Sequence, residues 1–371
     1  MSEKAKDRAD VRQKGENFVI SHLPNRTIVH EEKVYRFFSG TAYLGLPQHL
    51  SFQHLMADAI GRYGTVFGSS RNGNVRLGIY EVAEAKMADA TGAESALTVS
   101  SGMMAGQVVI NWLRGQKGTF VYAPAAHPAL WHEPVVALPS ISFADWTNQL
   151  SRQLQTVASG PVFILANALN AVRSDYYDFD WVNDLPDDRP ITLVVDDSHG
   201  LGVLNQGRGI WPQISHKSNV QLIVTASLAK AMGMPGGVIF GEATTLTNLR
   251  RTAFFGACSP MPPANLDVYL QADALYAEGY ERLQQNILLA EKLLLPTSLF
   301  RHATGYPVFF TEHDELYKHL LENEILIYSF AYPTANDRAN TRIVISAFHT
   351  SEDIQELADS VNEFQRRGRK G

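Results

Sequence analysis

Short apolar segments alternate with amphipathic segments along most of the chain. Six of the apolar segments are rich in Val and Ile and lack polar alternation, which is typical of strands that are buried on both faces of a parallel sheet. Helical spacing lies between them, as at Tyr80–Ala90 and Met103–Leu113, and this alternation predicts a doubly wound α/β domain. The predicted strands are Ala96–Ser100, Gly118–Tyr122, Pro161–Ala166, Ile191–Asp196, Gln221–Thr225 and Gly236–Gly241.

The pattern changes after residue 262. Pro263–Leu295 is Leu- and Ala-rich and predicts a long linking helix, and the segments after it predict a smaller α+β domain. Thr350 and Asp353 have the spacing of a capping box at the start of the last helix. We therefore expect an N-terminal arm (1–50), a large α/β domain (51–265) and a linking helix with a small domain (266–371). The expected elements of the small domain are strands Val308–Thr311, Ile325–Tyr332 and Arg342–Ala347 and helices Glu315–Glu324 and Ser351–Arg367.

Composition narrows the class of protein. The chain has 371 residues, a formal net charge of −6 and one cysteine. The charge gives no overall basic field for nucleic acid, and a single cysteine excludes an intramolecular disulfide and any CxxC metal site. The N-terminus is polar, and no run of 18 apolar residues is present. These features predict a soluble, cytoplasmic protein without a membrane span.

Acidic and imidazole groups follow one of the predicted strands. Leu193–Val195 leads into Asp196, Asp197 and His199. Ligands bind at the carboxyl ends of strands in doubly wound sheets, so these side chains mark a candidate site. A divalent metal is one interpretation, although no second acidic or His cluster supports it. An ordinary turn in which Asp197 caps a helix is the other.

One lysine, Lys230, lies in an otherwise apolar stretch after the next predicted strand. An unpaired buried ammonium is costly, but a lysine there could form a Schiff base with a carbonyl substrate or with pyridoxal phosphate (PLP). PLP also needs an acid opposite its pyridine nitrogen, phosphate donors and a group packed on its ring. Asp196 could be the acid, and His199 could reach the ring oxygen.

Candidate phosphate donors lie earlier in the chain. Ser101, Gly102 and Met103 follow a predicted strand and begin a predicted helix, where backbone N–H groups bind phosphate well. Ser227 adds a hydroxyl three residues before Lys230. His127, just after a predicted strand, could pack over the ring. Each of these motifs is weak when taken alone.

Taken in order, these motifs resemble the α-oxoamine synthase family of fold-type-I PLP enzymes. The resemblance runs from Tyr43 to the last predicted helix, and the Asp-His and Lys motifs are its most specific parts. The matched segments are Tyr43-Leu-Gly-Leu46, Gly68-Ser-Ser-Arg71, Ser100-Ser-Gly102, Val195-Asp-Asp-Ser-His-Gly200, Gly207-Arg-Gly209, Ser227-Leu-Ala-Lys230, Cys258-Ser-Pro-Met-Pro-Pro263, Asn340-Thr-Arg-Ile-Val-Ile-Ser346 and His349-Thr-Ser-Glu-Asp353.

The resemblance implies a fold-type-I PLP transferase that condenses an amino acid with an acyl thioester and releases CO₂. It implies that Lys230 binds PLP, and that Asp196, His199 and His127 contact the ring nitrogen, the ring oxygen and the ring face. Ser101, Gly102, Met103 and Ser227 would hold the phosphate. Ser259 would reach the phosphate in the neighbouring subunit of a homodimer. Arg342 would bind the substrate carboxylate, and the resemblance also places Tyr43, Thr41 and Arg71 at the substrate.

The sequence departs from the family mainly in the residues expected around the substrate. Two further interpretations therefore stay open: another fold-type-I reaction, such as an aminotransferase, aldolase or decarboxylase, and a non-catalytic PLP-binding relative. Retention of Lys230, Asp196, His199 and His127 argues against the second of these. The departures are Thr41, Tyr80, Ala123, Asn167, Ala168 and Val344.

Overall fold

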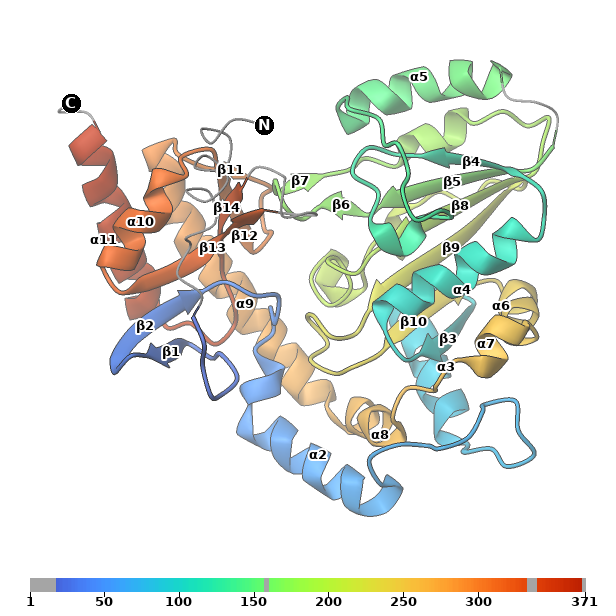
Figure 1. Cartoon of the computed structure of the whole chain (residues 1–371), viewed down its shortest axis with the longest axis horizontal. Helices are drawn as coiled ribbons and strands as arrows, with labels where there is room; N and C mark the ends of the chain where they lie inside the picture. The colour runs from blue at the N-terminus through green and yellow to red at the C-terminus, as the bar shows by residue number, and fades with distance from the viewer. Residues whose placement is uncertain (1–17, 157–159, 332–338, 369–371) are drawn as a thin grey trace, which may run out of the picture.

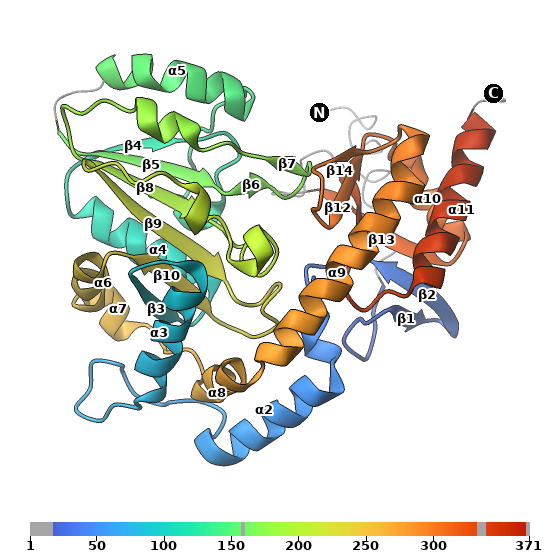
Figure 2. The same cartoon turned by 180° about the vertical axis from the view of Figure 1, so that it is seen from behind.

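The computed structural model describes residues 18–156, 160–331 and 339–368. Figures 1 and 2 show two lobes joined by the long helix α9. The predicted fold class, a mostly parallel α/β domain with a smaller C-terminal α+β part, is confirmed. The boundaries proposed for the domains remain predictions.

A six-stranded sheet forms the larger lobe, in the order β3-β10-β9-β8-β5-β4. The four strands from β9 to β4 are parallel, and β10 is antiparallel to both of its neighbours. All six strands are those predicted from the apolar segments. Their bounds are β3 (Ser95–Val99), β4 (Thr119–Tyr122), β5 (Val162–Asn167), β8 (Ile191–Asp196), β9 (Val220–Ser227) and β10 (Gly237–Gly241).

Successive residues of the central strands enter different hydrophobic clusters. In β8, Leu193 and Val195 belong to one cluster and Val194 belongs to the other. In β5, Ile164 belongs to the first of these clusters and its neighbour Phe163 belongs to the second. Because side chains alternate across a strand, the sheet is buried on both faces, which explains why these strands read as unbroken apolar runs.

Helices cover the sheet and extend to the second lobe. Helix α4 contacts β3, β9 and β10, while α3 contacts β3 and α8. The predicted single helix over Pro263–Leu295 is wrong. The chain leaves helical geometry at Ala272 (φ −96°, ψ 18°), so two helices form there. The helices are α2 (Leu50–Tyr63), α3 (Ile79–Thr91), α4 (Gly102–Arg114), α5 (Phe143–Thr156), α6 (Ala243–Arg250), α7 (Ala253–Ala257), α8 (Pro263–Gln271), α9 (Asp273–Leu294), α10 (Glu315–Glu322) and α11 (Ser351–Gly368).

The smaller lobe contains a second six-stranded sheet, in the order β1-β2-β13-β14-β12-β11. Two of its strands come from the segment predicted to be an N-terminal arm: β2 pairs in parallel with β13, and β1 forms the sheet edge. The predicted strand Ile325–Tyr332 is present as β13, but Tyr332 lies outside the described residues. The strands are β1 (Thr27–His30), β2 (Lys33–Phe38), β11 (Arg301–His302), β12 (Val308–Thr311), β13 (Ile325–Ala331) and β14 (Ala339–Val344).

A short hairpin of β6 (Leu169–Asn170) and β7 (Asp175–Tyr176) lies between the lobes (Figure 1). It contacts the smaller lobe through three consecutive residues. Ser174 Oγ accepts a hydrogen bond from the N–H of Ala303, and the Tyr176 hydroxyl donates one to the carbonyl of Thr304. The lobes are therefore held together by polar contacts as well as by α9.

The last helix begins as the sequence predicts. The N–H of Thr350 donates to the Asp353 carboxylate over 2.9 Å, and the N–H of Asp353 donates to Thr350 Oγ over 3.3 Å. This reciprocal pair is the predicted capping box. Across the described ranges, no helix combines the length and the apolar character that crossing a membrane requires.

Candidate active site

The predicted cofactor residues converge because each follows a strand of the large sheet. Asp196 ends β8, Ser227 ends β9 just before Lys230, and His127 follows β4. These parallel strands have their carboxyl ends at one edge. A cavity of about 260 Å³ opens there, and its wall includes His127, Asp196, His199 and Lys230. The structure thus brings together residues from three separate segments of the sequence.

Lys230 lies in a site that disfavours its positive charge. Burial lowers the pKa of its ammonium to about 8, with Asp196 acting in the opposite direction and the Arg342 guanidinium adding to the decrease. A lysine with this pKa is partly neutral near pH 8, so its nitrogen is available as a nucleophile or as a proton acceptor.

Two hydrogen bonds join the acidic motif to the lysine motif. The N–H of Ser198 donates to Asp196 Oδ1, and Ser198 Oγ accepts from the N–H of Ser227, both over 2.9 Å. The first bond orients the Asp196 carboxylate. The second holds the end of β9, and therefore the turn that leads to Lys230, against the end of β8.

The candidate phosphate cradle lies where α4 begins. Ser101 caps the helix, since its Oγ accepts from the N–H of Met104 over 3.2 Å. A Cβ on Gly102 would come within 2.5 Å of Ser227 Cβ, so only glycine allows this close approach. The N-terminus of α4, with Met103 half-exposed, and Ser227 therefore lie side by side, although none of these residues is on the cavity wall. A phosphate suits this donor set.

His127 is neutral in this setting. Its Nδ1 accepts a hydrogen bond from the N–H of Ala129 over 3.2 Å, so that nitrogen carries no proton. Burial lowers the pKa of the ring, even though Asp196 Oδ2 lies 3.6 Å from Nδ1 and opposes the decrease. A neutral, half-exposed imidazole on the cavity wall can pack against a flat aromatic ring.

Asn167, one of the departures from the family, holds the loop that carries His127. Its Oδ1 accepts from the backbone N–H of His127 over 3.0 Å, and its Nδ2 donates to the carbonyl of Ala125 over 2.7 Å. Asn167 and its neighbour Ala168 also line the cavity. This departure from the family therefore changes the cavity wall itself.

The imidazole of His199 is hydrogen-bonded to the hydroxyl of Tyr43. The Tyr43 hydroxyl lies 2.9 Å from His199 Nδ1. Burial lowers the pKa of His199 well below its ordinary value, and the charges of Lys230 and Arg342 lower it further. Tyr43, predicted to contact substrate, is buried and is absent from the cavity wall.

Arg342 is buried and is absent from the cavity wall, and its guanidinium is partly engaged. Its Nη1 donates to the carbonyl of Ala171 over 2.8 Å, and the guanidinium lies 4.1 Å from the centroid of the Tyr328 ring. Its buried Nε has no hydrogen-bond partner among the described residues. A donor is therefore available close to Lys230, where a carboxylate could accept from it.

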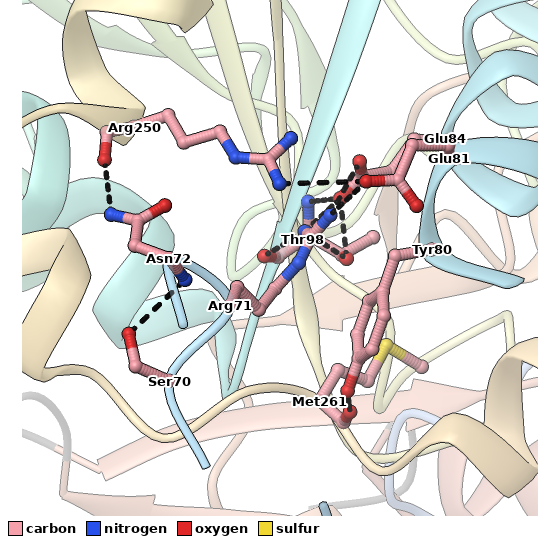
Figure 3. Close-up of polar contacts among 9 residues, drawn as sticks. All are labelled: Ser70, Arg71, Asn72, Tyr80, Glu81, Glu84, Thr98, Arg250 and Met261. Carbon is pink, nitrogen blue, oxygen red and sulfur yellow. Dashed lines mark hydrogen bonds and ion pairs between the residues drawn. The ribbon is translucent and has the colours of Figure 1, made fainter. Parts of the chain in front are cut away.

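Arg71 lies in a different buried network, shown in Figure 3. It forms two hydrogen bonds with the Glu84 carboxylate, one of them over 3.0 Å from Nη2, and its guanidinium lies 4.2 Å from the centroid of the Tyr80 ring. The Tyr80 hydroxyl donates to the carbonyl of Met261 over 2.6 Å. Neither Arg71 nor Tyr80 lines the cavity, so the predicted substrate contact of Arg71 has no counterpart within this chain's cavity.

The two remaining predicted residues also lie off the cavity wall. Thr41 is half-buried and Ser259 is exposed. Ser259 follows Cys258, whose Sγ lies 3.5 Å from Ser100 Oγ, next to the phosphate cradle. Ser259 is therefore on the surface near the site rather than inside it.

Sequence reasoning missed several cavity residues. Trp131 and Leu138 come from the segment after β4, Arg173 comes from the β6–β7 turn, and Asn340 comes from β14. None of them lies in a regular pattern that would have revealed it. They give the cavity an apolar side and a guanidinium at the hairpin tip.

Over the ranges that the structure describes, no group of three or more His, Cys, Asp or Glu side chains could hold a metal ion. Asp197, the second of the two acids in the motif, is buried. Its Oδ2 accepts a hydrogen bond from the N–H of Ile210 over 2.7 Å. Burial raises the pKa of this carboxyl to about 8. Asp197 therefore supports the loop behind the site.

Several known proteins are similar to this chain. A putative 8-amino-7-oxononanoate synthase of Methanococcus aeolicus is 26% identical, over 92% of this chain and 93% of that protein. The 8-amino-7-oxononanoate synthase of Dechloromonas aromatica is 26% identical, over 88% and 89%. These relatives confirm the resemblance to the α-oxoamine synthases.

Solved structures agree on the fold. A serine palmitoyltransferase of Sphingomonas wittichii has a TM-score of 0.80 at 15% identity, covering 98% of this chain and 96% of the other. The 8-amino-7-oxononanoate synthase of Francisella tularensis has a TM-score of 0.66 at 22% identity, covering 90% and 98%. Another serine palmitoyltransferase with this fold, from S. paucimobilis, was solved with a bound PLP–myriocin aldimine (TM-score 0.80, 17% identity, 99% and 96%). The model of the aminotransferase class I and II family matches residues 43–361, and the chain belongs to that family of PLP enzymes.

Proposed function

We propose that this chain condenses an amino acid with an acyl thioester, releasing CO₂ and the free thiol and yielding an α-aminoketone. The observation that carries the proposal is the single cavity whose wall contains Lys230, Asp196, His199 and His127. The 8-amino-7-oxononanoate synthases similar to this chain support the reaction type.

The residues present fit PLP. Gly102 brings the N-terminus of α4 directly beside Ser227, so backbone N–H groups and a hydroxyl that suit a phosphate lie together, and the carboxylate of Asp196 suits the pyridine nitrogen. Bound PLP supplies an electron sink for negative charge at the substrate α-carbon. Lys230 would bind the cofactor, Ser101, Gly102, Met103 and Ser227 would hold its phosphate, and His127 would pack on its ring.

Lys230 would also move the proton. Its amine would accept the proton from the substrate α-carbon. The pKa of about 8 keeps enough of it neutral near physiological pH. Asp196 would keep the pyridine nitrogen protonated, and His199 would donate to the ring oxygen.

The two substrates would occupy different parts of the cavity. Arg342, although it lies off the cavity wall, would bind the amino acid carboxylate through its unpartnered Nε. The acyl chain would lie against the apolar side formed by Trp131, Leu138 and Val172. A thioester carbonyl would then approach the α-carbon from which Lys230 has removed the proton.

The working unit would be a cytoplasmic homodimer with shared active sites. The exposed position of Ser259, beside the Cys258–Ser100 contact, supports a role for its hydroxyl at the partner's phosphate. The organisation that goes with this proposal is a large cofactor domain (51–265) and a C-terminal part (266–371), preceded by the N-terminal segment.

A spectroscopic and a kinetic experiment test the proposal together. The purified protein should absorb in the visible after incubation with PLP, and borohydride should fix the cofactor on Lys230, as peptide mass spectrometry would show. The Lys230→Ala variant should lack that adduct. Screening amino acids against acyl-CoA chain lengths should then detect amino-acid-dependent thiol release. Amino-group transfer to a keto acid without thiol release would support an aminotransferase instead, and no spectral response to any amino acid would support a non-catalytic relative.

A further inference from the structure

The Tyr43 hydroxyl contacts His199, a residue of the cavity wall, but Tyr43 itself does not line the cavity. Its hydroxyl lies 2.9 Å from His199 Nδ1, and only 1% of the Tyr43 surface is exposed. His199 lines the cavity and Tyr43 does not. The phenol therefore stands behind the imidazole, on the side opposite the space where a ligand would bind.

The backbone of Tyr43 is held by the smaller lobe. Its carbonyl accepts hydrogen bonds from the N–H of Ala347 over 2.8 Å and from Ser346 Oγ over 3.0 Å. Ser346 Oγ also bonds to the carbonyl of Ala42. These contacts leave the hydroxyl little freedom, so its position relative to His199 is set by the fold.

Charges around His199 keep the ring neutral. Burial lowers the pKa of His199 most, and the positive charges of Lys230 and Arg342 lower it further. Burial raises the pKa of Tyr43 above its ordinary value, although Arg342 opposes this, and the buried Tyr306 hydroxyl also faces it. A protonated phenol therefore meets a neutral imidazole, which has one nitrogen that accepts and one that donates.

We propose that Tyr43 is a positioning residue that holds His199 in the tautomer with hydrogen on Nε2. The phenol O–H donates to Nδ1, which leaves the Nε2–H to point into the cavity as a donor. This inference rests on the proposed function, because the group that would accept from Nε2–H is the ring oxygen of PLP. A donor there stabilises the anionic form of that oxygen.

Tyr43→Phe removes the hydroxyl and keeps the ring. Nitrogen-15 NMR of histidine-labelled apoprotein, assigned with a His199→Asn variant, should show protonated Nε2 and bare Nδ1 in the wild type. The variant should show a mixture of the two tautomers. In the PLP-loaded protein, the pH at which the visible absorption changes should rise by about one unit, since a hydrogen bond to a charged group is lost.

Tyr122→Phe is the matched control. It removes another phenol, whose hydroxyl lies 2.7 Å from His132 Nδ1, and neither residue lines the cavity. The control should leave the His199 signals and the absorption midpoint unchanged.

A wild type with hydrogen on Nδ1 would overturn the proposal, as would a folded Tyr43→Phe variant with wild-type tautomer and midpoint. The wild-type NMR result decides the question if the variant does not fold. Absence of any PLP absorption would instead count against the proposed function, while the apoprotein spectra still test the tautomer.

Discussion

The N–H of Ser227 donates a hydrogen bond to Ser198 Oγ over 2.9 Å, and this bond ties the lysine-bearing segment to the acid-bearing segment. Ser198 also donates its own N–H to Asp196. The seryl side chain between Asp196 and His199 is therefore a structural link between two parts of the cofactor site.

Ser198→Ala should weaken this link. The partly buried N–H of Ser227 would lose its partner, which costs about 1 kcal/mol of unfolding free energy. We expect weaker PLP binding as well, because Ser227 and the turn to Lys230 would be held less firmly. Urea unfolding of the apoprotein and titration with PLP measure both effects. Ser151→Ala, which removes an exposed hydroxyl bonded to the carbonyl of Asp184, is the control and should change neither value.

Arg71→Met should reduce stability much more than it affects substrate binding. The change leaves the Glu84 carboxylate buried without its cation, which costs about 3–5 kcal/mol when a buried ion pair is broken. Combining it with Glu84→Gln should restore part of the loss, because the unpaired charge is removed. Chemical denaturation gives the free energies. An unchanged unfolding midpoint together with a raised KM would show instead that Arg71 serves substrate.

The large sheet could be predicted from sequence because its strands are buried on both faces. Unbroken apolar runs identified every strand, and β8 (Ile191–Asp196) has the predicted bounds. The sequence could indicate the cavity residues Asp196, His199, Lys230 and His127 for a related reason, since each lies at the end of one of those runs or a few residues after it. Their roles toward PLP rest on the resemblance to the family and stay predictions.

Long-range polar pairings could not be predicted in this way. Tyr43 and His199 are 156 positions apart, and nothing near Tyr43 in the sequence indicates its partner. The pairing of β2 with β13 joins the two ends of the chain. Arg173 lies in a turn between two-residue strands, which are too short to have a period. Such contacts depend on how the lobes pack, which no single segment encodes.

Asp197 should make stability depend on pH. Burial raises the pKa of its carboxyl to about 8 in the folded state, above its ordinary value of 3.8. Between these two values the unfolded chain has released the proton and the folded chain has kept it. The free energy of unfolding should therefore fall as pH rises from about 4 to about 8.

The Asp197→Asn variant should lack that slope, because an amide does not titrate. Urea unfolding at several pH values, compared between wild type and variant, isolates the contribution of this carboxyl from those of other groups. Asp89→Asn, at an exposed position of α3, is the matched control and should retain the wild-type slope. Parallel pH profiles for wild type and Asp197→Asn would contradict the protonated state of Asp197.

Arg173→Ala should weaken binding of an anionic substrate group. Arg173 is exposed at the tip of the β6–β7 hairpin, and it lines the cavity that also contains Lys230. Because neighbouring Ser174 and Tyr176 are bonded to the smaller lobe, the hairpin holds this guanidinium at the cavity. Losing a hydrogen bond to a charged group costs about 1.5–3 kcal/mol, so the KM of the substrate that carries the anion should rise at least about tenfold.

The turnover number should change little in Arg173→Ala, because a contact made equally in the ground state and the transition state affects KM alone. Arg173→Lys should recover part of the affinity, since it keeps the charge and loses the bidentate fork. Raising the salt concentration should reduce the difference between wild type and Arg173→Ala by screening the exposed charge. Arg152→Ala, an exposed arginine on α5, is the control. If the KM values of both substrates are unchanged in Arg173→Ala, Arg173 makes no contact with substrate, and the selectivity of the cavity depends on Arg342 and its apolar side.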